Sequence, residues 1–289
     1  MKIGILGASG FLGGALADSL ADQGHEIIGF ALNPPLTQQN HVSYFAVSDL
    51  SAETHPSQFG LDAVINVAAR RSTRAHPLSD EEVRKYTFEI PRDFILRTAS
   101  PHTLVINAST YIQNFQGMAG RTVDSYGAAK EELSIFLSSI AKKDSFKTLD
   151  LYLFTIFGPG DKPSHLVPLL LNAAKSNEPI SLSPGHQLMN LIYVDDVVRN
   201  ISNTLLLPNL EPYQKHFVWN NEYFSVRQLV EVMETVAGVR IPCEWGGRDY
   251  VGHEMLEVWP IPMTQIPNFD ARISLEEGIA RLWARFKMK

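Results

Sequence analysis

Short apolar runs alternate with helical patterns along the first half of the chain. Strands are predicted where apolar side chains run without interruption, and helices where they recur every three or four positions. The predicted strands span residues 2–6, 26–32, 42–47, 63–67, 103–107 and 150–157, and the predicted helices span 11–23, 79–99 and 126–141. Because continuous apolar strands separated by helices are typical of a parallel sheet covered on both faces, the pattern predicts a doubly wound, Rossmann-like α/β fold.

The pattern changes after Gly160. Helices are predicted over residues 166–176, 194–206, 225–236 and 274–286, with short extended pieces at 180–182 and 215–219 and frequent prolines. This mixture indicates a smaller C-terminal α+β domain packed against the ends of the sheet strands. We therefore expect a first domain over residues 1–160 and a smaller one over 161–289, with some exchange of strands and helices between them.

The composition is that of a globular chain and argues against several classes of protein. The 289 residues are 45% apolar and carry a net charge of −6, which argues against a nucleic-acid partner. A single cysteine, Cys243, excludes an internal disulfide and fits a reducing compartment. No apolar stretch approaches about 18 residues, and glycines interrupt the N-terminal apolar run, so we expect neither a membrane span nor a signal peptide. These features predict a cytoplasmic protein.

Three glycines follow the first predicted strand, within the segment GASGFLG at 7–13. Between a strand and a helix, Gly7 permits a tight turn, Gly10 lets a pyrophosphate approach the backbone, and Gly13 lets the helix pack closely on the strand. The expected dinucleotide contacts of this loop are Gly7, Ser9, Gly10, Phe11, Leu12 and Gly13. The alternative is an ordinary glycine-rich turn. On the dinucleotide interpretation, the first domain binds the dinucleotide and the second binds a substrate.

The end of the second predicted strand bears on the choice between NAD and NADP. An acidic residue there binds the ribose 2′-hydroxyl, whereas a cation or a small polar group accepts the 2′-phosphate. Ala31 and Asn33 stand at this place, and neither is acidic, so the sequence favours NADP(H) over NAD(H). Asp49 and Leu50, after the third strand, are expected to contact the adenine, although Asp49 is equally compatible with a helix cap.

A tyrosine and a lysine stand four residues apart at the start of a predicted helix. Tyr126 and Lys130 therefore share one helix face, and Ser109 stands at the end of the fifth strand, at the edge of the sheet where ligands bind. A nearby ammonium is expected to lower the tyrosine pKa from about 10, so that the tyrosine exchanges a proton with a substrate oxygen while a hydride moves. The serine hydroxyl would hydrogen-bond the same oxygen.

At this point the sequence resembles the extended short-chain dehydrogenase/reductase family, also called the NAD-dependent epimerase/dehydratase family. The matching segments are the glycine loop, DAVINVAAR at 62–70, the trio Ser109, Tyr126 and Lys130, LFTIFGPGD at 153–161, IYVDDV at 192–197 and ISLEEGIARL at 273–282. The resemblance implies that Ser109, Tyr126 and Lys130 are catalytic. It implies further cofactor contacts at Ala68, Ala69, Tyr126, Lys130, Phe154 and Ile156. It also makes the paired Asp195 and Asp196 structural, tying the two domains together.

Several positions depart from the family pattern. Thr87 and Thr155 replace residues that are usually asparagine, and Met189-Asn190 replaces an Arg-Asp pair whose arginine often holds a nucleotide diphosphate. Arg248 resembles the second diphosphate-binding arginine, although a surface arginine is an equal alternative. The residues expected to contact the substrate are Thr110, Thr155, His165 and Arg248, with Thr110 as an alternative to Ser109 in catalysis. No two histidines have metal-ligand spacing, so no metal site is expected.

Three functions are compatible with these residues. The favoured function is NAD(P)H-dependent reduction of a nucleotide-linked 4-keto-6-deoxy sugar, with Tyr126 as proton donor. A dehydratase of the family carries Asp-Glu after the active-site threonine, where this chain has Tyr111-Ile112. A nucleotide-sugar 4-epimerase is the alternative. A non-catalytic dinucleotide sensor is the third hypothesis, although a sensor would most naturally have lost Tyr126 or Lys130. We expect a nucleotide-sugar substrate, no membrane partner and a homodimer.

Overall fold

The computed structural model describes residues 1–35, 42–50, 58–73, 76–141, 143, 146–207, 210–252 and 254–287. Its strands are β1 (Lys2–Leu6), β2 (Glu26–Ala31), β3 (Val42–Ala46), β4 (Ala63–Asn66), β5 (Leu104–Thr110), β6 (Lys147–Leu153), β7 (Thr155–Phe157), β8 (Ile180–Leu182), β9 (Leu188–Met189), β10 (Leu191–Tyr193), β11 (Tyr213–Val218), β12 (Phe224–Ser225) and β13 (Cys243–Trp245). Its α-helices are α1 (Phe11–Asp22), α2 (Asp80–Arg84), α3 (Ile90–Thr98), α4 (Ser125–Ala141), α5 (Leu166–Ser176), α6 (Val194–Thr204), α7 (Val226–Ala237) and α8 (Leu275–Lys287).

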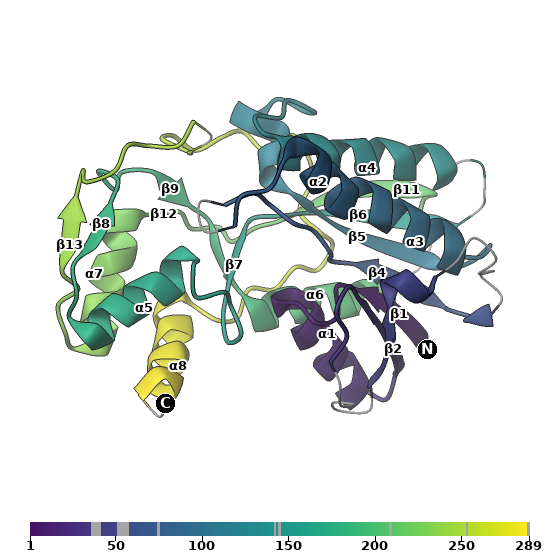
Figure 1. Ribbon diagram of the computed structural model, residues 1–289, viewed down its shortest axis with the longest axis horizontal. Coiled ribbons are helices and arrows are strands. Elements are labelled where there is room, and N and C mark those ends of the chain that lie inside the picture. The colour runs from purple at the N-terminus through teal and green to yellow at the C-terminus, as the bar shows by residue number, and fades with distance from the viewer. Residues whose placement is uncertain are drawn as a thin grey trace.

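A seven-stranded parallel sheet forms the centre of the larger lobe, in the order β11-β6-β5-β4-β1-β2-β3. Helices α2, α3 and α4 cover one face, and α1 and α6 cover the other (Figure 1). The chain order reverses between β1 and β4, and such a reversal opens a crevice at the carboxyl ends of the strands. The predicted doubly wound, Rossmann-like fold is therefore confirmed.

The strand expected over residues 150–157 is two strands, which is a correction. β6 begins at Lys147 and ends at Leu153, and β7 starts after Phe154. The backbone changes partner at this point: the Phe154 N–H donates to the Val218 carbonyl of β11, whereas the Thr155 N–H donates to the Asn190 carbonyl. β7 then pairs with β10, so one apolar run serves two sheets.

The helix expected over 79–99 is also interrupted. It begins as predicted, because Ser79 and Glu82 form a reciprocal capping box at the start of α2. A π-helical turn, Lys85–Glu89, then separates α2 from α3, which carries Pro91 in its first turn. Such turns often mark functional sites, and this one places the Thr87 side chain in the interior.

The second lobe contains α5, α7, α8 and three short two-stranded sheets (Figure 1). Two elements from beyond residue 160 nevertheless belong to the layers of the central sheet: β11 pairs with β6, and α6 packs on α1. The domain boundary at residue 160 stays a prediction. Buried Asp196 of α6 accepts the backbone N–H groups of Arg272 and Ile273, just before α8, and so has the structural tying role that the family resemblance implied.

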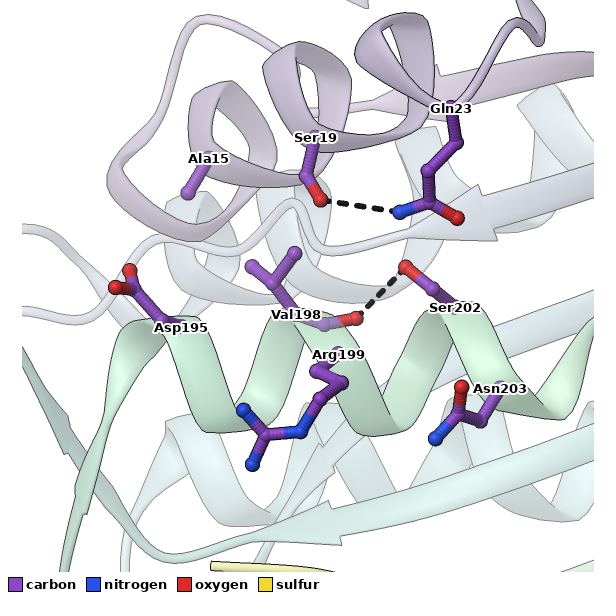
Figure 2. A pocket seen from close by; sticks show the side chains of 8 residues that line it. All are labelled: Ala15, Ser19, Gln23, Asp195, Val198, Arg199, Ser202 and Asn203. Carbon is purple, nitrogen blue, oxygen red and sulfur yellow. Dashed lines mark hydrogen bonds between the residues drawn. The ribbon is translucent and has the colours of Figure 1, made fainter. Parts of the chain in front are cut away.

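A polar groove of about 430 Å³ runs between α1 and α6. Figure 2 shows its lining, in which Gln23 bonds to Ser19 on α1, and the Ser202 hydroxyl donates to the Val198 carbonyl on α6. The groove shares no lining residue with the cavity beside the glycine loop described below. Among the helices that the structure describes, none combines the length and apolarity needed to cross a bilayer.

Candidate active site

The glycine loop between β1 and α1 has the backbone geometry expected of it. Gly7 has φ of +90°, which side-chain-bearing residues rarely adopt, and its N–H donates to the Phe30 carbonyl at 2.8 Å. A Cβ on Gly13 would lie 2.1 Å from the Gly7 carbonyl oxygen. The expected tasks of Gly7 in the turn and of Gly13 in helix packing are therefore confirmed.

A cavity of about 240 Å³ opens beside this loop, at the reversal point of the sheet. The predicted cofactor residues that line it are Gly7, Ser9, Gly10, Ala31, Asn33, Ala68 and Ala69. The structure adds Leu6, Leu32, Val47, Val67, Arg70, Tyr86, Ile90 and Lys162, which the sequence analysis did not name. Arg70 directly follows the family segment and Lys162 follows the GPGD sequence, but neither position has a motif that marks a cation as a ligand.

Other predicted cofactor residues lie around this cavity rather than in its lining. Phe11, Leu12 and Gly13 form the first turn of α1. Leu50 lines a neighbouring cavity of about 430 Å³ with Val47 and Tyr86, and exposed Asp49 lies in a 3₁₀ turn. Phe154 and Ile156 lie at the junction of β6 and β7, where buried Phe154 stacks on Tyr111 with ring centroids 4.6 Å apart.

Thr87 fixes the segment that follows β4. Its hydroxyl donates to the Arg70 carbonyl at 3.0 Å, and the Arg70 N–H donates back to the hydroxyl at 3.2 Å. The preceding Ala68 N–H donates to the Asn66 side-chain oxygen. Two side chains therefore hold the strip of backbone that passes the cavity, one of them at the position where the family usually has asparagine.

Tyr126 and Lys130 occupy the first turns of α4. The Asp124 carboxylate caps the helix by accepting the Gly127 N–H at 2.7 Å. The Lys130 side chain is only 2% exposed, and its Nζ donates to the Ala108 carbonyl of β5 at 2.6 Å. The helix thus carries a tyrosine and a buried lysine to the carboxyl edge of the sheet, next to the end of β5.

The pKa of Tyr126 differs from the expected one. Burial raises it to about 12, Arg71 opposes this rise, and Asp124 adds to it. The Arg71 guanidinium lies 5.6 Å from the centre of the Tyr126 ring and pairs with Asp124 at 2.8 Å. The expectation of a pKa lowered by Lys130 is therefore wrong: the cation that acts on the phenol is Arg71, which the sequence analysis did not identify.

Ser109 and Thr110 lie side by side at the end of β5. The Ser109 side chain is 4% exposed, and its hydroxyl donates to Asp150 at 2.6 Å and lies 3.2 Å from the Ser134 hydroxyl. Successive side chains of a strand point to opposite faces, so Thr110 points away from Asp150. The Thr110 N–H donates to Gln113 at 2.9 Å.

The other residues expected to contact the substrate do not line the cavity beside the glycine loop. The Thr155 backbone bonds to Asn190 at the start of β7. His165 is half-exposed at the start of α5 and pairs with buried Asp161 at 2.6 Å. Arg248 is exposed in the loop after β13, where its N–H donates to the Leu182 carbonyl. Within the described ranges, no group of three His, Cys, Asp or Glu side chains is placed to hold a metal ion.

The model of the NAD dependent epimerase/dehydratase family matches residues 3–218. The chain belongs to this family. The family expected from the sequence is thus confirmed, and the protein is an NAD(P)-dependent enzyme of the extended short-chain dehydrogenase/reductase type. Its glycine loop, its tyrosine-lysine pair and the cavity are the parts from which any more specific function has to be argued.

Relatives within the family carry different names. A CDP-abequose synthase of Yersinia pseudotuberculosis is 26% identical over 212 residues, which are 70% of this chain and 72% of the relative. A probable UDP-glucuronate 4-epimerase of Rhizobium meliloti (strain 1021) is 21% identical, over 97% of this chain and 95% of the relative. The solved UDP-glucuronic acid 4-epimerase from Bacillus cereus, in complex with UDP-glucuronic acid and NAD, superposes with a TM-score of 0.85 at 16% identity, covering 100% of this chain and 99% of that one. The last similarity shows a shared fold.

Proposed function

We propose that the protein reduces a nucleotide-linked 4-keto-6-deoxy sugar with NAD(P)H, and that Tyr126 donates the proton. The observation that carries this proposal is the half-buried Tyr126 beside the Arg71 guanidinium, whose phenol, with a pKa raised by burial to about 12, stays protonated at neutral pH. A reductase needs a proton donor, whereas the oxidation that begins an epimerisation needs a base. The relatives named for CDP-linked and UDP-linked sugars support a nucleotide-linked substrate.

The glycine loop fits a dinucleotide. A turn with positive φ at Gly7, the space beside Gly10 and the N-terminus of α1 together form a cradle for a pyrophosphate, and Arg70 and Lys162 add positive charge at the cavity. When bound, the reduced nicotinamide supplies the hydride that the substrate carbonyl carbon accepts. The Tyr126 phenol gives its proton to the carbonyl oxygen, which becomes a hydroxyl.

We place the hydroxyl that steadies this oxygen on Thr110. The Ser109 hydroxyl already donates its proton to Asp150, so it has none left for a substrate. Thr110 ends the same strand on its other face, at the carboxyl edge of the sheet. The proposed catalytic residues are therefore Thr110, Tyr126 and Lys130. Ser109 has a structural role, because its hydroxyl binds Asp150.

The residues after Thr110 support a reductase rather than a dehydratase. Tyr111 stacks on Phe154 and lies 5.9 Å from the Trp259 ring, which in turn contacts Phe115. The two residues after Thr110 are Tyr111 and the buried Ile112, so no carboxylate stands there to serve a dehydration.

A 4-epimerase is the second candidate, because UDP-sugar 4-epimerases recur among the relatives. An epimerase retains its dinucleotide, whereas a reductase exchanges it at every turnover. We expect the purified protein to release its dinucleotide readily and to oxidise NAD(P)H in the presence of a 4-keto-6-deoxy sugar nucleotide. Retention of oxidised dinucleotide, with interconversion of 4-epimers, would instead establish the epimerase.

The dinucleotide preference is part of this proposal. No acidic side chain stands at Ala31 or Asn33, and both line the cavity together with Arg70 and Lys162. These features favour NADPH, although solved structures of the same fold contain NAD. Comparing kcat/KM for NADPH and NADH decides between them. The expected homodimer is likewise a proposal, which light scattering of the purified protein tests.

Replacing Arg248 by alanine is expected to raise KM for the nucleotide-linked substrate about tenfold, because one charge-assisted hydrogen bond to the diphosphate is lost. Arg240→Ala is the matched control, since this arginine is 92% exposed and pairs with Glu234 on the same lobe. Steady-state kinetics with varied substrate measure both variants. An unchanged KM for Arg248→Ala rules out its role at the diphosphate.

Replacing Arg71 by methionine is expected to lower kcat at neutral pH about tenfold. Arg71 opposes the rise in the Tyr126 pKa, so its loss raises that pKa further and makes the phenol a weaker acid. The neighbouring Arg70→Met is the comparison, because Arg70 lines the cavity and should change KM for the dinucleotide instead. Equal kcat values for Arg71→Met and the unmodified enzyme argue against this electrostatic role.

A further inference from the structure

A buried carboxylate lies in the central sheet, midway along β6. Asp150 is completely inaccessible to solvent, and its two oxygens accept three hydrogen bonds from side chains. Asn107 donates to Oδ1 at 2.8 Å, Ser109 donates to the same oxygen at 2.6 Å, and Tyr213 of β11 donates to Oδ2 at 2.8 Å. Three side-chain donors therefore satisfy one buried carboxyl group.

This carboxylate has no cation in direct contact. In the part of the chain that the structure describes, Asp150 forms no ion pair, and the Lys130 ammonium forms none either. A buried charge without a paired partner is costly, because burial removes its hydration. The two buried groups, Asp150 on β6 and Lys130 on α4, are therefore not paired directly, and both bond to residues of β5.

The connection between the two charges passes through adjacent residues of β5. Lys130 Nζ donates to the Ala108 carbonyl, and the next residue, Ser109, donates to Asp150. Ser134, one turn after Lys130 on α4, contacts the Ser109 hydroxyl at 3.2 Å. The helix that carries the catalytic pair is thus held to the strand through the same group of side chains that surrounds the carboxylate.

The same group extends to the cofactor segment. Asn107 accepts from the side chain of Asn66 at 2.7 Å, and Asn66 accepts the N–H of Ala68, which lines the dinucleotide cavity. One chain of hydrogen bonds therefore crosses β4, β5 and β6 below the site.

We propose that Asp150 is a positioning residue, whose buried negative charge keeps the Lys130 ammonium protonated on the helix that also carries Tyr126. The catalytic part of this inference rests on the reductase proposed above. Burial lowers the pKa of Lys130 to about 8, and Asp150 acts in the opposite direction. Without this carboxylate, Lys130 would lose its proton near neutral pH, and the site would lose its buried cation.

Other titratable groups face this region from each neighbouring element. Glu131 on α4 accepts from Gln113 and acts on Tyr152 and Tyr213, whose pKa values are raised by burial first and then by Asp150. Lys215 on β11 lies 5.6 Å from the centre of the Tyr152 ring. Neither Glu131 nor Lys215 is among the groups that shift Lys130, so the test below varies Asp150 and Lys130 alone.

The test is the pH dependence of unfolding, which requires no substrate. The attraction exists only while both groups are charged, so the stability penalty of Asp150→Asn should shrink as pH rises through the Lys130 pKa. If the carboxylate raises that pKa by about one unit, the ratio of the two unfolding constants changes about tenfold between about pH 6 and pH 9. Asp196→Asn, another buried carboxylate, should show a penalty that does not change over this range.

A reciprocal variant keeps the inference testable if Asp150→Asn does not fold. Lys130→Met removes the cation, and its stability penalty should be smaller at acidic pH than at neutral pH, because coupling between two groups is mutual. If the stability penalty does not change with pH in whichever of these two variants folds, the proposed coupling is wrong.

The catalytic consequence is measured separately. In Asp150→Asn, the alkaline fall in kcat for reduction of the 4-keto sugar nucleotide should move about one pH unit lower, whereas Asp196→Asn keeps the original profile. If the unfolding measurements show the coupling but the pH profile of kcat in Asp150→Asn is unchanged, the positioning role is wrong. If the unmodified enzyme does not reduce such a sugar, the reductase proposal fails, while the unfolding measurements still decide the coupling.

Discussion

Tyr126→Phe is expected to reduce kcat about 10³-fold and to leave dinucleotide affinity nearly unchanged. The phenol oxygen is the only group that this substitution removes. Tyr126 is not among the residues that line the cavity beside the glycine loop, so we expect that part of the dinucleotide site to be unchanged. Loss of the proton donor therefore affects the chemical step, because the oxygen of the reduced carbonyl is left without its proton.

Single-turnover oxidation of NADPH and equilibrium binding of the dinucleotide measure these two effects. Tyr193→Phe is the control, since Tyr193 is buried against Phe157 in the second lobe and should keep kcat within about twofold. If Tyr126→Phe retained more than about a tenth of the activity, the proton would come from another group. A large loss of dinucleotide affinity would instead indicate a structural defect.

The positions of Tyr126 and Lys130 were predictable because they are local. A spacing of four on one helix brings two side chains to one face whatever the rest of the fold does. The position of Arg71 was not predictable, since it reaches Tyr126 from the segment after β4, more than fifty residues earlier in the chain. Its charge nevertheless opposes the rise in the Tyr126 pKa. The sequence analysis had assigned this effect on the pKa to Lys130.

The distinction between Ser109 and Thr110 shows the same limit. The sequence places both hydroxyls at the end of β5, but only the register of β6 puts Asp150 within 2.6 Å of the Ser109 oxygen. A single aspartate inside an apolar run gives no indication of which neighbour it will bind. The fold was easier to predict, because the pattern of apolar residues indicates the buried strands directly. The change of strand partner at Phe154 could not be predicted in this way, because it depends on β10 and β11.

Gly13→Ala is expected to destabilise the protein by about 3 kcal/mol, because the new methyl carbon would lie 2.1 Å from the Gly7 carbonyl oxygen. The obstacle is backbone, which has no rotamer with which to escape. Either α1 moves away from β1, or the glycine turn is pushed outward. Both movements displace the N–H groups at the start of α1 that are proposed to bind the pyrophosphate.

The same substitution is expected to weaken dinucleotide binding at least about tenfold, which corresponds to the loss of one charge-assisted hydrogen bond. Gly14→Ala is the matched control: its Cβ would lie 3.6 Å from the Ala8 oxygen, an ordinary contact, and alanine favours a helix by about 0.5–1 kcal/mol over glycine. Chemical denaturation and dinucleotide titration of both variants separate the effects. If Gly13→Ala were as stable as Gly14→Ala and bound the dinucleotide as tightly, then the proposed binding site would not depend on close packing of α1 against the glycine turn.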